Sequence, residues 1–509
     1  MNNKINYSLL SVYDKQGIIE FAKTLQKLDY KIISTGGTAK KLSDENISVV
    51  PISEITSEPE SFDGRMKTIS FQIESGILFD RKNLSHQKQA NQLGIKPIDI
   101  VVCNLYPFEK ESTIENIDVG GPTMIRAAAK NFKNVIVVID PHDYAKVSEG
   151  LLNNSIPQDM RQELAAKAFA HLSLYDSLIA RFLNKKLFPE ELTLPLRKIQ
   201  DLRYGENPHQ KAAFYLEPKT NSPLKSLNKI AGRDLSLVNL TDINAGIESV
   251  RLFKEPCAVV IKHNSPCGIA IGNTISQALG RAIEADPESA FGGIIVVNKK
   301  VDEKTVKKVS DFKNERKSNI DIFAAPEFDQ KAVDLLIKTR KSLGVYSFAK
   351  LLPVKKSEKN LKFVLGGAII QTLDYINDQK EWKIVTKKKP SKQQLVQMKI
   401  AWKFISRIKS NTIIIMDKEL PMTRGIGSGQ TSRIKSTEIA LLQARHYTQG
   451  AVLASDSFFP FSDSVNLAVK HGISAIVQQG GSIKDQAIID AANSAGIAMV
   501  FTNRRAFWH

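Results

Sequence analysis

The sequence has few cysteines and no long apolar run, and both shortages exclude classes of protein. Its three cysteines, Cys103, Cys257 and Cys267, form no Cys-x-x-Cys pair, so neither a disulfide framework nor a zinc knuckle is expected. No apolar stretch approaches the roughly 18 residues that a membrane helix needs, and the first residues lack a basic segment followed by a long apolar one. We therefore expect a cytoplasmic protein that does not enter a membrane.

Motifs of nucleotide and metal chemistry are missing as well. No Gly-Lys-Ser or Gly-Lys-Thr closes a GxxxxG run, and no complete GxGxxG opens a βαβ unit. These absences argue against kinases, ATPases and dehydrogenases. There is no HExxH and no set of His, Cys and carboxylate residues with convincing ligand spacing, so we expect no catalytic metal.

Negative charge is in short supply, because 53 Asp and Glu residues stand against 71 Lys and Arg residues, for a formal net charge of +18. Such a balance favours anionic partners through its long-range field. The basic residues are scattered, and the aromatic residues, 7% of the chain, do not interleave with them as in a single-strand binding platform. We expect a lysine-rich solvated surface and no specific nucleic-acid partner.

The 509 residues are enough for several compact units, and the hydrophobic pattern is of α/β type. The first segments predict a strand at 7–13, a helix at 17–28 and a strand at 30–34. Further apolar runs at 98–106 and 134–140 predict buried parallel strands. The chain therefore opens with a βαβ unit that continues into a larger sheet.

Helical spacing of apolar residues predicts a long helix at 161–186, and the Pro-containing segment at 187–198 is typical of a linker. We place a domain boundary near residue 190. Apolar runs of α/β type follow at 257–262, 292–298, 363–370, 411–416, 450–455 and 474–479. The basic segments 310–319 and 355–362 are expected to be surface connections, and no internal repeat is evident.

Lys262 and His263 follow the apolar run 258–261 directly and precede a Pro and Gly turn. Ligands of α/β enzymes bind beyond the carboxyl ends of strands, so this junction is a candidate catalytic edge. A histidine moves protons near neutral pH, and a neighbouring lysine can hold an anion or a developing oxyanion. The alternative is a strand that ends in two solvated polar residues.

Four places share an apolar strand followed by paired or spaced glycines and then a helical segment. They are 33–42, 116–131, 423–442 and 476–493. Glycine lets backbone amides approach an anion, and the positive N-terminal end of the helix adds to the attraction. Glycine pairs also serve simple tight turns, but four such junctions predict phosphorylated ligands. Polar candidates for a shared site near the first two are Lys15, Arg65, Lys67, Tyr106, Asp118 and Lys130.

A series of longer motifs runs along the chain in the order STGGTAK, DGRMKT, CNLYPF, IDVGGPTMIRAAAKN, LRYGENPHQ, VIKHNSPCG, ESAFGGII, IKSNTI, GIGSGQTSR and SDSFFPF. In this order they resemble the bifunctional enzymes of late purine biosynthesis. This family combines 5-aminoimidazole-4-carboxamide ribonucleotide (AICAR) formyltransferase with inosine monophosphate (IMP) cyclohydrolase. The resemblance extends from SLLSVYDKQG to the terminal FWH.

The resemblance implies an α/β fold with an N-terminal methylglyoxal synthase-like domain, residues 1–190, and two cytidine deaminase-like lobes without zinc in residues 191–509. It implies formyl transfer from 10-formyltetrahydrofolate, as co-substrate, to the 5-amino group of AICAR, and closure of the formylated AICAR to IMP with loss of water. A homodimer with formyltransferase sites at the interface is expected. An alternative keeps the formyltransferase but makes the first domain only a nucleotide-binding or regulatory module.

For formyl transfer, the resemblance implies that Lys262 and His263 are the catalytic pair and that Asn411 assists. An aromatic amine is a weak nucleophile, so a base that removes its proton and a cation that steadies the tetrahedral intermediate both lower the barrier. Substrate contacts are implied for Arg203, Tyr204, Asn239, Asp321, Arg433, Phe461 and Arg505.

For ring closure, the resemblance implies catalytic roles for Lys67, Tyr106, Asp118 and Lys130. Positioning, proton transfer and oxyanion stabilisation would do the work. The phosphate and the rest of the substrate would be held by Lys15, Thr35, Gly36, Gly37, Thr38, Arg65 and Thr68.

One stretch departs from the family pattern. After its Arg-x-Lys-Thr segment the family usually continues into Leu-His-Pro and then a His- or Gly-rich stretch, whereas residues 68–75 of this chain read TISFQIES. The segment TSEPES at 56–61 and Tyr13 also differ from the usual residues. Because these changes cluster in the first domain, we expect different nucleotide binding or slower ring closure there, while formyl transfer persists.

Overall fold

The computed structural model describes residues 6–62, 65–316, 318–348, 351–355, 357–374 and 382–509. It divides into two compact units, Met1–Lys198 with Tyr215–Lys219 and Ile199–Phe214 with Thr220–His509. The strands β6 (Arg197–Leu202) and β7 (Ala212–Leu216) pair with each other, and the division passes through them. No helix in these described ranges is long and apolar enough to cross a membrane.

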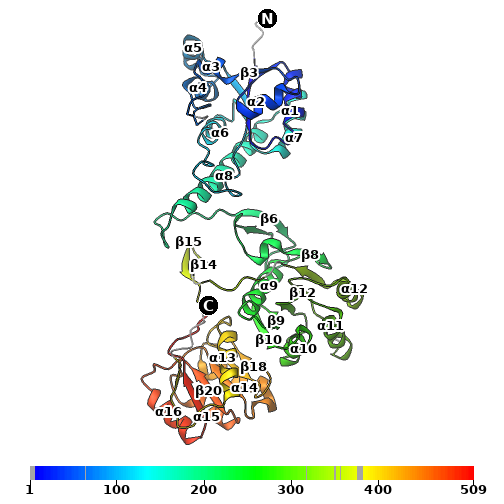
Figure 1. Cartoon of the computed structure of the whole chain (residues 1–509), viewed down its shortest axis with the longest axis vertical. Helices are drawn as coiled ribbons and strands as arrows, with labels where there is room; N and C mark the ends of the chain where they lie inside the picture. Colours follow the sequence, from blue (N-terminus) through cyan, green and yellow to red (C-terminus); the bar gives the residue numbers. More distant parts are fainter. Residues whose placement is uncertain (1–5, 63–64, 317, 349–350, 356, 375–381) are drawn as a thin grey trace. The chain divides into compact units, whose positions relative to one another are not determined.

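The first unit contains a parallel sheet surrounded by helices (Figure 1). Its strands are β1 (Asn6–Val12), β2 (Tyr30–Ser34), β3 (Val49–Pro51), β4 (Ile98–Asn104) and β5 (Ile136–Val138). Its helices are α1 (Ile18–Lys27), α2 (Gly36–Ser43), α3 (Ile52–Thr56), α4 (Phe71–Leu78), α5 (Leu84–Gln92), α6 (Gly120–Lys130), η1 (Pro141–Asp143), α7 (Tyr144–Leu152) and α8 (Gln158–Leu183). The strand order is β3-β2-β1-β4-β5, and all neighbours are parallel.

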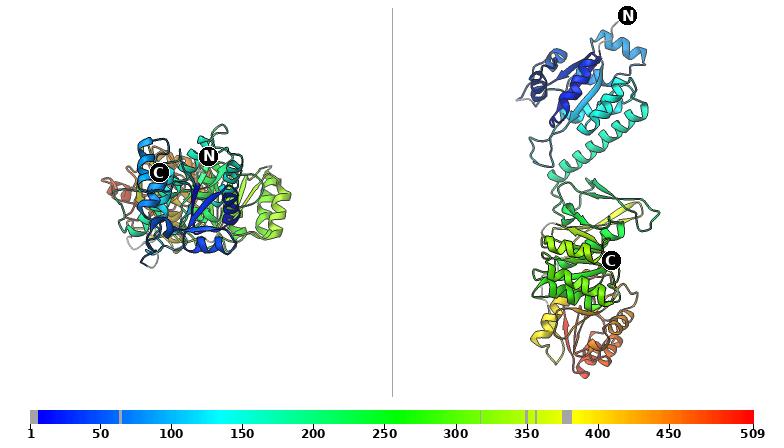
Figure 2. Two further views of the ribbon diagram at one scale, coloured as in Figure 1. Left: turned by 90° about the horizontal axis from the view of Figure 1, so that it is seen from above. Right: turned by 90° about the vertical axis from the view of Figure 1, so that its right-hand side faces the viewer.

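This order contains a switch point between β1 and β4. From β1 the chain builds outward through β2 and β3, and it later returns to β4 and β5 on the other side. The expected strand, helix and strand at the start of the chain are confirmed as β1, α1 and β2. The predicted long helix is confirmed as α8, the long cyan helix of Figure 2. It packs on β5 and α6. At such a switch point the connections leave in opposite directions and open a crevice at the carboxyl ends of the strands.

The second unit contains two lobes. The first is formed by β8 (Asn228–Ala231), α9 (Leu237–Val250), β9 (Cys257–Lys262), β10 (Ser265–Ile271), α10 (Ile275–Ala285), β11 (Ile294–Val297), α11 (Glu303–Arg316), β12 (Ile322–Ala325), α12 (Gln330–Thr339) and β13 (Gly344–Ser347). The second is formed by β16 (Lys383–Ile384), α13 (Lys392–Ile405), β17 (Ile413–Met416), β18 (Thr423–Gly427), α14 (Arg433–Ala444), β19 (Val452–Ser455), α15 (Asp463–Lys470), β20 (Ala475–Gln478), α16 (Asp485–Ser494) and β21 (Ala498–Phe501). The remaining elements are η2 (Pro223–Ser226), β14 (Lys359–Val364), β15 (Gly367–Thr372) and η3 (Arg445–Thr448).

The two lobes repeat each other. Their sheets have the orders β10-β9-β11-β12-β13-β8 and β18-β17-β19-β20-β21-β16. In each sheet an antiparallel hairpin lies beside three parallel strands, and an antiparallel strand closes the far edge. Helices occupy the same places along both series, and α9 and α13 both begin with a capping box. No repeat is evident in the sequence because the repeat lies in the order of the strands and helices rather than in recognisable residues.

One hydrophobic core contains residues of both lobes, among them Phe253 and Phe404, whose ring centroids are 5.0 Å apart. Each lobe has a further core of its own. Sheets buried on both faces explain the unbroken Ile and Val runs of β9, β11, β17 and β20, since an alternating pattern arises only where one face meets water.

Two segments of the second unit differ from expectation. The run 363–370 belongs to an exposed hairpin of β14 and β15, and Leu365 at its tip is 105% exposed. The segment 310–319 is not simply a surface connection, because its residues up to Arg316 end α11. Val306, Val309 and Phe312 of this helix are buried, since a spacing of three keeps them on one face.

Candidate active sites

A cavity of about 820 Å³ lies at the carboxyl ends of β1, β2 and β4 in the first unit. It gathers most of the residues that the sequence assigns to ring closure. Those that line it are Lys15, Thr35, Gly36, Gly37, Thr38, Arg65, Lys67, Thr68, Tyr106 and Asp118. They come from distant segments and meet because the strand order switches direction at this edge.

The N-terminal end of α2 forms one side of this cavity. A Cβ atom on Gly36 would lie 3.5 Å from Nζ of Lys67, and one on Gly37 would lie 3.8 Å from Nζ of Lys15. No side chain caps the first amides of this helix, whereas Thr38 uses its hydroxyl to bond the backbone of Val12. Two ammonium groups beside uncapped helical amides form a site for an anion such as phosphate.

The N-terminal end of α6 forms another side. Asp118 Oδ1 accepts a hydrogen bond from the amide of Gly121 at 2.9 Å, and the Asp118 amide donates to Tyr175 Oη at 2.7 Å. Burial raises the pKa of the Asp118 carboxyl, and the Gly121 hydrogen bond opposes that shift. A carboxyl whose pKa is raised exchanges its proton more readily near neutral pH, which suits acid–base work.

Asn104 also lines the cavity, although the sequence did not single it out. Its Oδ1 accepts hydrogen bonds from the amides of Tyr13 and Asp14 at 2.7 and 2.8 Å. It thereby fixes the loop after β1, where the ring centroid of Tyr13 lies 5.3 Å from that of Tyr106. Its position at the end of β4, two residues before Tyr106, is the signal that could have identified it.

Lys130 is not brought to this cavity. It is exposed at the last residue of α6, about 15 Å along the helix from Gly120 at about 1.5 Å per residue. Thr68, which ends the Arg-x-Lys-Thr segment, lines the cavity, and the departing residues from Phe71 onward belong to α4. Tyr13, another departure, does line the cavity.

Lys262 and His263 lie where β9 turns into β10. His263 and Asn264 have φ angles of +55° and +60°, and Lys262 pairs with Ser265, the pattern of a two-residue type I′ hairpin. Since β9 is antiparallel to β11, this turn lies at the amino ends of the parallel strands. The expected Pro and Gly turn is wrong, because Pro266 already belongs to β10.

A buried carboxylate that the sequence did not point out holds this turn. Asp242 of α9, which is 4% exposed, accepts a hydrogen bond from the Asn264 amide at 2.6 Å. Burial raises the pKa of the Asp242 carboxyl, while hydrogen bonds from Asn264 and His263 and the charge of His263 lower it. Lys262 Nζ donates to the carbonyl of Phe291 at 2.8 Å, so the backbone is fixed while the imidazole remains exposed.

Three further candidates, Arg203, Tyr204 and Asn239, belong to the N-terminal end of α9 or to the loop that contacts it. The Tyr204 carbonyl accepts a hydrogen bond from the Leu237 amide at 3.0 Å, and the Arg203 guanidinium lies 4.7 Å from the centre of the Tyr204 ring. Asn239 Oδ1 accepts from the Ser236 amide at 3.1 Å. Asn239 therefore caps the helix. Arg203, the cation among these three residues, is exposed.

Asp321 precedes β12 at the same edge of the sheet as Lys262. Both of its carboxylate oxygens are ion-paired, Oδ2 with Arg233 at 2.7 Å and Oδ1 with Arg340 at 2.8 Å. In this structure Asp321 thus joins two arginines, which lie toward β13 and β8 rather than toward β9.

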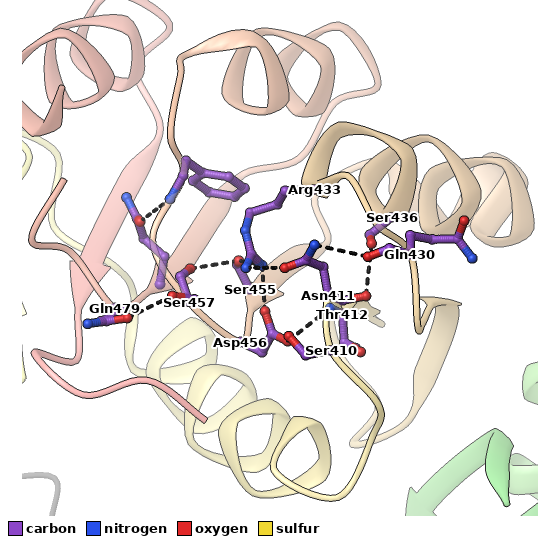
Figure 3. A network of polar contacts seen from close by, with 12 residues as sticks. Ser410, Asn411, Thr412, Gln430, Arg433, Ser436, Ser455, Asp456, Ser457 and Gln479 are labelled. Atoms are coloured by element: carbon purple, nitrogen blue, oxygen red, sulfur yellow. Dashed lines mark hydrogen bonds and ion pairs between the residues drawn. The ribbon is translucent and has the colours of Figure 1, made fainter. Parts of the chain in front are cut away.

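Two of the second-lobe candidates, Asn411 and Arg433, meet at the carboxyl end of β19 (Figure 3). Asn411 precedes β17, and Arg433 begins α14; Arg433 Nη2 donates to Asn411 Oδ1 at 2.8 Å. Phe461, 58% exposed, follows in the next loop, and Arg505 is exposed near the C-terminus. Arg433 also pairs with Asp456, a residue of the SDSFFPF motif that the sequence did not distinguish.

The four glycine junctions have different uses. The first two, at 33–42 and 116–131, line the cavity of the first unit. In the third, the Ser432 hydroxyl caps α14. In the fourth, the amides of Gly481 and Ser482 donate to the carboxylate of Asp485 at 2.6 and 3.1 Å. A carboxylate of the chain thus takes the place that a phosphate would occupy there.

Within the described ranges, no cluster of three or more His, Cys, Asp or Glu residues could hold a metal ion, and the three cysteines are buried and free. The fold combines an anion site at helix ends in one unit with a Lys-His turn and an Asn-Arg-Asp network in the other. Such an arrangement is typical of an α/β enzyme that acts on a phosphorylated metabolite.

Known proteins agree with this class. Residues 17–133 match the model of the MGS-like domain, and residues 128–443 match that of the AICARFT/IMPCHase bienzyme. "Bifunctional purine biosynthesis protein PurH" of Thermoanaerobacter sp. (strain X514) is 45% identical over 99% of both chains. Proteins of the same name from Caldicellulosiruptor saccharolyticus and Oceanobacillus iheyensis are 44% and 43% identical, again over 99% of both chains.

The chain therefore belongs to the family of AICARFT/IMPCHase bienzymes. It is accordingly a bifunctional enzyme of purine biosynthesis, with AICAR formyltransferase and IMP cyclohydrolase activities and 10-formyltetrahydrofolate as formyl donor. The expected N-terminal MGS-like domain is confirmed.

Proposed function

We propose that ring closure takes place in the cavity of the first unit, within a domain of residues 1–190. The convergence of the α2 and α6 N-terminal ends with the ammonium groups of Lys15 and Lys67 carries this proposal. The phosphate of formylated AICAR binds Lys15 and the backbone of 35–38. Arg65 and Thr68 contact the rest of the nucleotide.

In this reaction the carboxamide nitrogen attacks the formyl carbon and a C–N bond forms. The C–O bond then breaks, the 5-formamido nitrogen gives up its proton as a C=N bond forms, and water leaves. Asp118 accepts the proton of the attacking nitrogen, and Lys67 and Tyr106 stabilise the oxygen that becomes the leaving water. The raised pKa of Asp118 helps it to return that proton to the departing oxygen. Lys130 lies too far along α6 to join these steps from its present position, so its catalytic role has the weakest support.

Formyl transfer is assigned to residues 191–509. His263 removes a proton from the 5-amino group of AICAR as its nitrogen attacks the formyl carbon, and Lys262 stabilises the tetrahedral oxyanion. The bond to the folate nitrogen then breaks, that nitrogen takes up the proton from His263, and tetrahydrofolate leaves; Asn411 assists this step. AICAR contacts are assigned to Arg203, Tyr204, Asn239, Asp321, Arg433, Phe461 and Arg505.

The formyltransferase residues lie on both lobes, and a homodimer that completes each site across its interface accounts for that division. The hairpin of β14 and β15 supports a partner, because Phe363, Leu365 and Ile369 are 71%, 105% and 57% exposed. A two-stranded hairpin is marginal alone in water, and exposed apolar patches mark interaction surfaces. A second copy of the chain would cover this hairpin.

The shared strand order of the lobes supports assigning both to the cytidine deaminase-like type, without zinc. Three free, buried cysteines are in keeping with a reducing compartment, and we assign the enzyme to the cytoplasm.

A single incubation tests the division of labour. The protein is mixed with AICAR and 10-formyltetrahydrofolate, and tetrahydrofolate, formylated AICAR and IMP are followed separately. Stoichiometric tetrahydrofolate and IMP are expected. Saturable binding of formylated AICAR without IMP would instead make the first unit a nucleotide-binding or regulatory module. Slow ring closure would point to Tyr13, the departing residue on the cavity wall.

A further inference from the structure

Asp456 is fully buried at the carboxyl end of β19, and its carboxylate is enclosed by hydrogen-bond donors (Figure 3). Oδ1 accepts from Arg433 Nη1 at 2.5 Å. Oδ2 accepts from Ser410 Oγ at 2.6 Å and from the Thr412 amide at 3.0 Å. A buried ion pair needs such additional hydrogen bonds to offset its desolvation, and Asp456 therefore holds the guanidinium of Arg433 in one place.

Arg433 passes this constraint to Asn411. Its Nη2 donates to Asn411 Oδ1 at 2.8 Å, while Asn411 Nδ2 donates to the Gln430 carbonyl at 2.9 Å. Ser436 Oγ also donates to the backbone carbonyl of Asn411 at 2.9 Å. The amide plane of Asn411 is thereby fixed on both sides (Figure 3).

The repeated lobe shows that the fold does not need a charge at this position. The residue that follows β11, as Asp456 follows β19, is Asn298. Its Oδ1 accepts from the Cys257 amide at 2.8 Å, and the strand registers match this bond to the one between Asp456 and Thr412. A neutral side chain is therefore sufficient to secure the start of the neighbouring strand.

The partners of the charge are also confined to the second lobe. Arg433 begins α14 after a capping Ser, whereas Ile275 begins α10 after a capping Thr. Asn411 lies one residue before Thr412, and the matching position in the first lobe is Pro256. The carboxylate, the guanidinium and the amide thus occur together only where Asn411 is assigned to formyl transfer.

We propose that Asp456 is a positioning residue for formyl transfer, which acts through Arg433 to hold the Asn411 amide in its working orientation. The proposal rests on the assignment of Asn411 to that reaction. Asp456 itself does not touch the substrate, since Arg433, Ser410 and Thr412 surround its carboxylate.

The test is Asp456→Asn, which introduces the side-chain type of the sister lobe and keeps an oxygen for the Thr412 amide. It removes the charge that holds Arg433. We expect kcat for formyl transfer to fall about 10- to 100-fold, as when a residue that orients a metal ligand is lost. Conversion of formylated AICAR to IMP should stay unchanged because it belongs to the other unit. Unchanged kcat for formyl transfer in the folded variant would overturn the proposal.

A double-mutant cycle separates positioning from general damage. If Asp456 acts through Asn411, the combined variant Asp456→Asn/Asn411→Ala has the same kcat as Asn411→Ala alone. Losses that multiply would show independent effects and contradict the proposal. Full kcat in Asn411→Ala would instead show that the assignment of Asn411 is wrong, and the inference would fall with it.

Asp417→Asn is the matched control. Asp417 is 7% exposed and pairs with Arg424 at 2.7 Å at the other end of β17. An equal loss of formyl transfer in this variant, per folded enzyme, would mean that any buried charge in the lobe matters and would sink the proposal. If Asp456→Asn does not fold, the double variant Asp456→Asn/Arg433→Gln removes both charges of the buried pair. Unchanged kcat for formyl transfer in that folded protein would likewise overturn the proposal.

Discussion

Replacing Glu74 by glutamine is expected to stabilise the first unit at alkaline pH and to leave it unchanged at acid pH. Glu74 lies in α4, and its Oε1 is buried without a hydrogen-bond partner among the described residues. Burial raises the pKa of this carboxyl from 4.5 to about 7. The folded chain therefore binds the Glu74 proton more tightly than the unfolded chain does.

The sign of the pH effect follows from this difference. The protonated Glu74 carboxyl contributes its full stabilisation below the unfolded pKa of 4.5. This contribution is lost as the pH rises to about 7, because Glu74 ionises more easily in the unfolded chain. At about 1.36 kcal/mol per pH unit, the upper bound is about 3.4 kcal/mol. Partial solvent screening reduces this to about 1.5 kcal/mol.

For a unit of this size, about 1.5 kcal/mol corresponds to a rise in Tm of about 3 to 6 °C. Scanning calorimetry of the full chain at pH 8 and pH 5 measures it, with the transition of the first unit identified by its shift when IMP is added. Glu20→Gln is the control, since the Glu20 side chain is 78% exposed. An equal rise at both pH values, or none at pH 8, would refute the account of Glu74.

Three other changes test the assigned sites and the assembly. His263→Ala should lower formyl transfer about 10²- to 10⁴-fold, the usual effect of losing a general acid or base, while the conversion of formylated AICAR to IMP survives. Lys67→Ala should do the reverse in the same pair of assays, and equal loss of both activities in both variants would indicate misfolding or wrong assignment. Leu365→Asp combined with Phe363→Asp should shift the molecular mass measured by light scattering toward the monomer and lower formyl transfer; an unchanged dimer would remove the hairpin from the interface.

The cavity of the first unit could largely be predicted from the sequence, and the reason is the parallel sheet. In such a sheet the segments after each strand lie at one edge, so the residues after β1, β2 and β4 had to meet. The glycines at 36–37 and 120–121 mark helix starts that face this edge. The position of Lys130 could not be predicted in the same way, because a helix of this length carries its last residue away from the edge where it begins.

The edge that carries Lys262 was harder to predict, because β9 is antiparallel to both of its neighbours. Its end therefore lies at the amino ends of the parallel strands. The tight turn has no glycine of its own: His263 and Asn264 both adopt positive φ, which asparagine tolerates better than most residues. The hydrogen bond that Asp242 accepts from the Asn264 amide of this turn depends on the packing of α9, which the sequence pattern does not reveal.

The Asp456 network could not be predicted because its members meet only through strand pairing. Asp456 and Arg433 are 23 residues apart in the chain, and each has an ordinary local reading, as a strand-end carboxylate and a helix-start cation. Antiparallel pairing of β17 with β18 and β19 brings the starts and ends of these segments to one edge. A buried arginine at that edge requires an anion, whereas the first lobe, with Ile275 in that place, requires none. The comparison of the lobes thus separates what the backbone needs, an acceptor for one amide, from what the assigned chemistry needs, a fixed Asn411.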